Sequence, residues 1–337
     1  MDKRDFIGFT YAAPLYGFGE EPGLLEAAKR VLALGCRTLK LFLPPSYRSF
    51  YGFDPDWPAC ATVAEIAQAA PMRRALDLDF HTLVLEYAPL ASGFPEGFSA
   101  AQLAEEYRQT YDLAAWLFTA YAGTGKTFIL QNWESDWAVR GASRDPETDP
   151  APEAIDHLVE WANNRQAAVD AARRDHPGAG VNVWHCLEAN LVLRGMEGHI
   201  SVATHAFPRT HCDLYSYSAY DTSIDRERFG EALDFLLAHC PASETVGERN
   251  LMVGEFGIPE NEFSPEAIDA CIENTLQQAY DRGLRHAIYW QLYDNERSET
   301  DPSGCRGFWL IRKDGSPAHC YPLFTKWLKE DATCAAW

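Results

Sequence analysis

The chain has 337 residues, of which 47% are hydrophobic and 13% aromatic, and this is enough apolar material for one large core. Its formal net charge is −20, from 49 acidic and 29 basic residues. A surface this acidic repels phosphate backbones and anionic lipids, so we expect neither nucleic acid nor a membrane as a partner, whereas neutral sugars meet no such penalty.

Short apolar segments alternate with longer helical segments along the chain, a pattern typical of a parallel α/β protein. The predicted strands are nearly continuous in apolar character, which suits strands covered on both faces. We predict strands at 6–11, 38–43, 81–87, 127–133, 181–186, 213–218, 251–256 and 286–292. We predict helices at 22–34, 61–70, 99–121, 152–174, 225–239, 264–282 and 321–330. The pattern assigns nothing to 188–212.

The order of these elements predicts a closed barrel. A (β/α)8 TIM barrel needs roughly 250 residues and tolerates loop insertions, and no Pro/Gly/Ser-rich linker divides this chain. A doubly wound sheet fits the alternation, and two domains fit the length, but no glycine-rich nucleotide turn follows the first strand. We therefore predict one (β/α)8 domain over 1–337, with long βα loops.

The cellular location rests on two weaker features. The N-terminal residues contain no apolar run of signal-peptide length, and no stretch of about 18 apolar residues suggests a membrane span. The nine cysteines are scattered and form no CxxC pair. We therefore expect a cytoplasmic protein with reduced thiols, and a mature secreted form stays open. The oligomeric state is left open.

Two predicted strands run into glutamates at their carboxyl ends, the fourth into Glu134 and the seventh into Glu255. In a (β/α)8 barrel the catalytic side chains project from these strand ends. Two carboxylates three strands apart would face each other across the barrel mouth, and cleavage of a glycosidic bond needs such a pair. A surface glutamate or an ordinary ion pair is the alternative for each residue.

The motifs around these glutamates resemble those of clan A glycoside hydrolases, the retaining (β/α)8 enzymes that include cellulases and mannanases. Residues 253–257 (Val-Gly-Glu-Phe-Gly) resemble the seventh-strand nucleophile motif, and 132–134 (Asn-Trp-Glu) resemble the fourth-strand acid/base motif. Residues 288–291 (Ile-Tyr-Trp-Gln) resemble the eighth strand, whose Trp carries the sugar. The resemblance spans about 6–328. It implies Glu255 as nucleophile, Glu134 as acid/base, an oligosaccharide or glycoside substrate, and neither metal nor cofactor.

The sequence departs from that family pattern at three places. Trp133 separates Asn132 from Glu134, although Asn132 and Glu134 would still share a strand face by the period-two rule. Lys40 stands where the family commonly carries Arg, and it offers a point charge in place of a bidentate fork. Ser218 stands where His is often found. The resemblance is therefore to an outlying family, with no specific substrate.

We expect the substrate to contact polar and aromatic side chains near the strand ends, because aromatic faces stack on sugars. We also expect Glu255 to be held ionised by neighbours such as Tyr217, and burial to raise the pKa of Glu134. Core packing is the alternative for each aromatic residue. The predicted substrate-binding residues are Lys40, Asn132, Trp133, Tyr217, Tyr220 and Trp290.

Two other functions stay open at this point. One is a metal-dependent barrel such as a sugar isomerase, because five residues near predicted strand ends are possible ligands of a divalent cation: Glu86, Glu134, His185, Glu188 and Glu255. The other is a barrel that binds carbohydrate without cleaving it.

Overall fold

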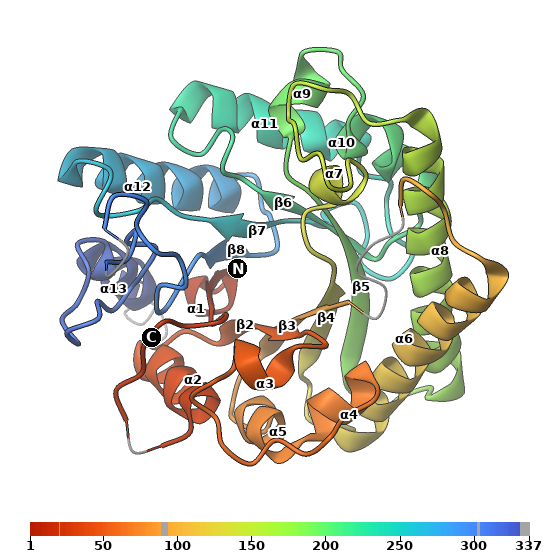
Figure 1. The fold of residues 1–337 in the computed structure, drawn as a ribbon, viewed down its shortest axis with the longest axis horizontal. Coiled ribbons are helices and arrows are strands. Elements are labelled where there is room, and N and C mark those ends of the chain that lie inside the picture. Colours follow the sequence, from red (N-terminus) through yellow and green to blue (C-terminus); the bar gives the residue numbers. More distant parts are fainter. Residues whose placement is uncertain (20, 89–93, 302–303, 331–337) are drawn as a thin grey trace, which may run out of the picture.

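A computed structural model describes residues 1–19, 21–88, 94–301 and 304–330. Eight parallel strands close into a barrel in chain order, since β1 pairs with both β2 and β8. Helices surround the strands (Figure 1). This confirms the predicted (β/α)8 barrel. The strands are β1 Ile7–Thr10, β2 Thr38–Leu43, β3 Thr82–Tyr87, β4 Thr127–Gln131, β5 Asn182–Ala189, β6 Leu214–Ser218, β7 Leu251–Phe256 and β8 Ala287–Tyr289.

Three strands end two or more residues away from the predicted position. β4 and β8 stop at Gln131 and Tyr289, because the chain turns away from the neighbouring strands there. β5 continues to Ala189 and is paired with β6 up to that residue. Glu188 therefore lies inside a strand, while Glu134 lies beyond one, and this changes the direction of several side chains.

The longer helices begin at residues that suit a helix start. Ser99 caps the amino end of α6 in a capping box with Gln102, and Asp225 and Ser264 cap α11 and α12 through their side chains. The predicted helix 61–70 corresponds to α4, which ends before the extended residue Ala69, and α5 from Ala70 to Leu76 was not predicted. Helices α6 and α8 lie side by side (Figure 1). The α-helices are α1 Lys3–Phe6, α2 Gly23–Ala33, α3 Tyr47–Phe50, α4 Val63–Gln68, α5 Ala70–Leu76, α6 Ala100–Ala120, α7 Ser135–Ala138, α8 Pro152–Asp175, α9 Val192–Met196, α10 Val202–His205, α11 Arg226–His239, α12 Pro265–Asp281 and α13 Tyr321–Glu330, and η1 Phe207–Arg209 is a 3-10 helix.

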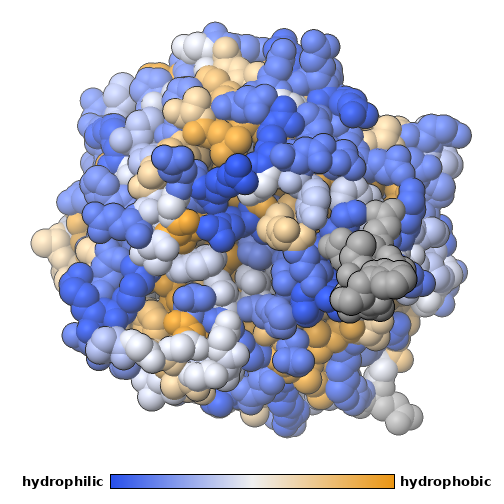
Figure 2. All heavy atoms as spheres, turned by 180° about the vertical axis from the view of Figure 1, so that it is seen from behind, coloured by the Kyte–Doolittle hydropathy of each residue, from blue (hydrophilic) through white to orange (hydrophobic). Residues whose placement is uncertain are grey.

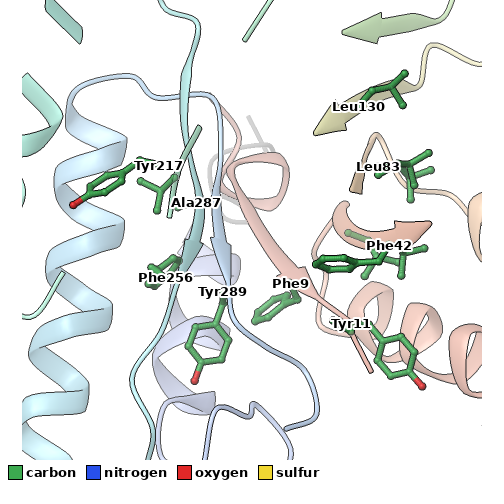
Figure 3. Packing of buried hydrophobic residues seen from close by; sticks show 14 of the residues in the cluster. Phe9, Tyr11, Phe42, Leu83, Leu130, Tyr217, Phe256, Ala287 and Tyr289 are labelled. Carbon is green, nitrogen blue, oxygen red and sulfur yellow. The ribbon is translucent and has the colours of Figure 1, made fainter. Parts of the chain in front are cut away.

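The core has one part inside the barrel and one outside it. Inside, an apolar layer is fully buried and consists of Val84, Ile129, Cys186, Leu214, Met252 and Ile288. Outside, aromatic rings fill the space between strands and helices: the ring centroids of Phe9 and Tyr289 lie 6.3 Å apart, and those of Phe256 and Tyr289 lie 5.7 Å apart (Figure 3).

The apolar layer closes the barrel beneath its mouth. Two residues further along the chain from each of these, a second set follows, most of it polar: Glu86, Gln131, Glu188, Ser216, Gly254 and, directly after β8, Trp290. Because side chains alternate with period two along a strand, residues two apart share a face, so this set lies directly above the apolar layer. The fold thus concentrates polar groups at the carboxyl ends of the strands.

The outer surface agrees with the composition. Hydrophilic residues cover most of the face in Figure 2, with apolar residues in separate small patches. Within the described ranges, no helix is long and apolar enough to cross a bilayer. Eight cysteines in that part of the chain carry free thiols. Cys334 lies outside the described residues.

Candidate active site

The carboxylate of Glu255 is buried at the end of β7 and paired with a buried lysine. The Lys40 ammonium lies 2.7 Å from Glu255 Oε1 and 3.3 Å from Glu86 Oε2. Burial alone would lower the pKa of Lys40, but the charges of Glu255, Glu188 and Glu86 raise it above its ordinary value. Lys40 is therefore a fixed cation beneath Glu255. We had predicted that Lys40 contacts the substrate, but its side chain is fully buried and bound to carboxylates.

A β-bulge turns Glu255 into the barrel. On β6 and β7, Tyr217 pairs with Val253 but Ser218 pairs with Glu255, so Gly254 is the extra residue. Gly254 faces inward, because a methyl group there would lie 1.9 Å from Ser216 Oγ. Strict alternation would then point Glu255 outward, and the bulge restores it to the interior. The position requires glycine because Ser216 occupies the space of a side chain.

Glu134 enters the same mouth from the turn after β4. It is the N-cap residue of α7, and its Oε1 accepts a 2.7 Å hydrogen bond from the Ser218 hydroxyl. Ser218 is also the partner of Glu255 in the strand register. Burial raises the pKa of Glu134 to about 8, and the charge of Glu255 adds to this. The two candidate carboxyl groups therefore adjoin one serine but have different surroundings.

Glu188 holds the turn that carries Glu134. Its Oε1 accepts from the Glu134 backbone N–H at 3.2 Å, and its own N–H donates to Asn132 Oδ1 at 3.3 Å. Its Oε2 accepts from Ser216 Oγ at 2.7 Å and from the Gln131 amide. Burial raises the pKa of Glu188 to about 7, and the Lys40 charge opposes that rise. Glu188 thus ties β5 to both ends of the β4 turn.

Glu86 completes the cluster of carboxyl groups. It lies on β3 beside Lys40, and burial raises its pKa well above the ordinary value, with the charge of Glu255 adding to the effect. One lysine therefore stands among Glu86, Glu188 and Glu255, and the cluster cannot hold all of its carboxyl groups ionised at low cost.

Of the two tyrosines predicted to contact substrate, only Tyr220 reaches the mouth. Its hydroxyl donates to Glu255 Oε2 at 3.4 Å, and its side chain is 36% exposed. The prediction that Tyr217 holds Glu255 is wrong. Tyr217 is fully buried on the outer face of β6, where it stacks on Phe229 and its hydroxyl contacts Asp221 and Thr222. The alternation along β6 sends Ser216 and Ser218 inward and Tyr217 outward.

The other predicted contact residues fall into two groups. Trp290 follows β8 and is partly exposed, with its ring edge-on to Phe42 at 6.1 Å between centroids. Trp133 is 38% exposed on the turn after β4. The prediction that Asn132 shares a strand face with Glu134 is wrong, because β4 ends at Gln131. The Asn132 amide is bound within the protein, to Ser135 Oγ at 2.8 Å and to the Trp133 carbonyl.

Of the five residues considered as metal ligands, His185 lies apart from the four glutamates. His185 lies on the outer face of β5, where its backbone N–H binds Asp213 and burial lowers its pKa well below the ordinary value. The four glutamates face inward around Lys40. Across the described ranges, no group of three or more His, Cys, Asp or Glu side chains is arranged to hold a metal ion.

Sequence reasoning missed Ser216 and Gln131 as parts of the site and noted Ser218 only as a departure from the family pattern. It considered Glu86 and Glu188 only as metal ligands. The alternation of Tyr and Ser at 215–218 contained a usable signal. Two serines at period two in a buried strand must face a polar region, because an unpartnered buried hydroxyl is costly.

Comparison with known proteins gives a likeness of fold. A scan against models of protein families and a search of curated sequences find no match. A family 5 xyloglucanase from Paenibacillus pabuli superposes with a TM-score of 0.64 and 10% identity, over 97% of this chain and 98% of that one. A family 5 lichenase from Caldicellulosiruptor sp. F32 gives 0.61 and 11%, over 97% and 92%. The β-glucuronidase 2 of Bacteroides uniformis gives 0.60 and 11%, over 97% of this chain and 35% of that one. At such identities the likeness establishes the barrel alone.

Proposed function

We propose that this protein is a retaining glycoside hydrolase that cleaves an O-glycosidic bond through Glu134 and Glu255. One observation carries the proposal: two buried carboxyl groups meet at the barrel mouth, and their surroundings differ. Glu255 is paired with the Lys40 ammonium, whereas burial raises the pKa of Glu134 to about 8. Glycosidases need this division between a carboxylate and a proton donor.

Each glutamate then has a defined role. The Glu255 carboxylate attacks the anomeric carbon, while protonated Glu134 gives its proton to the leaving oxygen, so a covalent glycosyl-enzyme forms and the aglycone departs. Glu134, now a base, takes a proton from water, and that water displaces Glu255 from the anomeric carbon. The two displacements give net retention of configuration.

The surroundings of the two glutamates support these roles. Lys40 and the Tyr220 hydroxyl stabilise the carboxylate of Glu255, and the Ser218 hydroxyl orients Glu134. Trp290 and Trp133 are exposed enough to carry a sugar ring. The structural neighbours named as a xyloglucanase and a lichenase make β-linked gluco-oligosaccharides the first substrates to test.

The test compares Glu134→Ala and Glu255→Ala on substrates with good and poor leaving groups. Glu255→Ala should abolish turnover of every substrate, because the nucleophile is gone. Glu134→Ala should lower kcat/KM by roughly 10²–10⁴-fold for oligosaccharides and far less for activated aryl glycosides, which need no protonation. Added azide should give a glycosyl azide of retained configuration from Glu134→Ala and of inverted configuration from Glu255→Ala.

Glu160→Ala, at an exposed position on α8, is the matched control and should behave as the wild type. Wild-type activity of either active-site variant on a natural glycoside would remove that residue from the mechanism. Loss of activity in chelator with recovery on adding one metal would favour the metal-dependent alternative. Sugar affinity without turnover in the wild type, unchanged in both variants, would favour a binding barrel.

A further inference from the structure

A cavity of about 630 Å³ lies beside the mouth, and its described lining comes from residues 87–88 and 94–96, from residues 132–144 after β4, and from helix α8. It takes in Asn132 and Trp133, the two residues before Glu134, but its lining includes neither Glu134 nor Glu255. Aromatic side chains form part of its lining: Tyr87, Phe94, Trp133, Trp137 and Trp161. The cavity is therefore next to the candidate active site without being part of it.

This cavity is rich in arginine, and two of its arginines have acidic partners that are not among the lining residues: Arg165 is paired with Glu106, and Arg140 Nη1 lies 3.8 Å from Asp136 Oδ1. Three arginines, Arg140, Arg144 and Arg165, are among its described lining residues, with Glu96 as the acidic one. The chain as a whole has a net charge of −20. An acidic molecule attracts anions poorly, so a local group of arginines is needed wherever it binds one.

Arg165 is held rigidly at the base of the cavity. Its guanidinium lies between the rings of Tyr87 and Trp161, 3.9 Å from each centroid. Its Nε donates to Glu106, and its Nη2 donates to the Tyr87 carbonyl at 3.3 Å. Its Nη1 is buried and has no hydrogen-bond acceptor among the residues described here.

Arg140 is also bound within the protein through two of its three guanidinium nitrogens. Its Nε donates to the Thr148 carbonyl at 3.1 Å, and its Nη1 donates to the Asp136 carbonyl at 2.8 Å. Its Nη2 is likewise buried without an acceptor in the described part of the chain. A buried N–H group without a partner is costly, so two such groups at one cavity indicate a missing acceptor.

Arg144 stands at the opening, where its guanidinium lies 4.9 Å from the centre of the exposed Trp133 ring. Arginine matches a carboxylate in a planar, bidentate way, and an aromatic face beside it can pack against a sugar ring. These two features together suit a sugar that carries an acid.

We propose that this cavity binds an acidic sugar unit, a uronate, with its carboxylate toward Arg140, Arg144 and Arg165 and its ring beside Trp133. The inference rests on the proposed function and deepens it: the glycan is anionic, and its uronate lies next to the bond that Glu134 and Glu255 cleave. The overall acidity of the chain does not prevent this, because the arginines are gathered at one place.

The test measures binding, so that it does not depend on turnover. D-glucuronate, D-glucose and acetate are titrated into the wild type and followed by tryptophan fluorescence, with Arg144→Ala and Arg140→Lys as the cavity variants. Glucuronate should bind at least tenfold more tightly than glucose or acetate, and added salt should weaken it. Arg144→Ala and Arg140→Lys should each weaken it at least fivefold, whereas Arg174→Ala, at an exposed position on α8, should leave it unchanged.

Equal affinity for glucose and glucuronate, or for acetate and glucuronate, would overturn the inference. So would unchanged glucuronate binding in both cavity variants. The proposed function fails separately: if no glycoside is cleaved but glucuronate binding depends on Arg144, the cavity is a uronate site on a protein that is not a hydrolase. If neutral glycosides are cleaved and glucuronate does not bind, the hydrolase stands without the uronate site.

Discussion

Four buried glutamates and one buried lysine share the barrel mouth, so their surroundings decide which carboxyl groups keep a proton. Glu255 takes the closest contact with Lys40. Burial raises the pKa of Glu134 to about 8 and that of Glu188 to about 7, and it raises that of Glu86 as well. Carboxyl groups at the mouth therefore stay protonated near neutral pH, as a proton donor must. Their raised pKa values also make the stability of the fold depend on pH.

Glu134→Gln should make the protein more stable at alkaline pH. The pKa of Glu134 rises from 4.5 to about 8 on folding, so the native state holds a proton that the unfolded state has lost. The stability that protonated Glu134 contributes to the native state is fully present below about pH 4.5. It is lost as the pH rises through about 8. Glutamine cannot ionise, so urea unfolding at pH 9 should show a gain of about 1–3 kcal/mol over the wild type, shrinking toward zero at pH 5. Glu160→Gln is the exposed control, and an equal gain at both pH values would contradict the argument.

Two short elements determine where the carboxyl groups point. The bulge at Gly254 turns Glu255 inward, and the turn from Gln131 to Ser135 brings Glu134 over the mouth. Both elements contact Glu188 on β5, through its hydrogen bond to Glu134 and its closeness to Gly254. Glu188 therefore acts on the proposed chemistry by position and by charge.

Glu188→Gln should shift the pH profile as well as slow the reaction. Its charge contributes to the raised pKa of Glu134, so removing that charge should move the alkaline limb of kcat/KM to lower pH. Weakening of the hydrogen bond between Glu188 and the Glu134 backbone should lower kcat by roughly 10–100-fold, since a misplaced donor transfers protons poorly. The pH–rate profile of an aryl glycoside measures both effects. A lower kcat with an unmoved alkaline limb would leave Glu188 as a purely structural residue.

Gly254→Ala should damage the site through packing. The added methyl would lie 1.9 Å from Ser216 Oγ and 2.5 Å from Glu188 Oε2, so strands β5 to β7 must move apart. We expect a loss of about 1–3 kcal/mol in unfolding free energy and a large loss of activity. Gly52→Ala is the control, because its methyl would meet nothing closer than the Ser49 carbonyl at 3.6 Å. A stable Gly254→Ala with wild-type activity would show that the bulge adapts freely.

The whole molecule is organised around closure of the barrel. Pairing of β1 with β8 joins the two ends of the strand order, and the apolar layer within the strands supports the polar mouth above it. All but one of the cysteines lie in the described residues, where their thiols are free, and six of those eight are buried. Burial keeps these thiols away from reagents in solution, so the number that react depends on whether the protein is folded. This difference gives a test of the expected cytoplasmic location.

Thiol titration tests that location. If the protein is cytoplasmic, all nine cysteines of the chain should react in denaturant without reductant. In the native state few should react, because burial both hides the thiols and raises the pKa of Cys36, Cys212 and Cys320. The assay counts reacted thiols before and after unfolding, with a reduced sample as reference. Three or four disulfides in the purified protein would overturn the cytoplasmic expectation.

The sequence alone determined the architecture, and the resemblance of its motifs pointed to the candidate pair. A buried parallel strand is a local apolar run, so eight such runs between helices predict the barrel, and the carboxyl end of each strand predicts where Glu134 and Glu255 meet. Only the tertiary structure decided the rest. Three findings depend on where each strand ends and on one bulge. Glu255 is contacted by Tyr220 and not by Tyr217, the amide of Asn132 is bound within the protein, and Glu188 holds the turn that carries Glu134. Strand ends and bulges follow from the hydrogen-bond register between segments distant in the chain, and a local pattern does not contain that register.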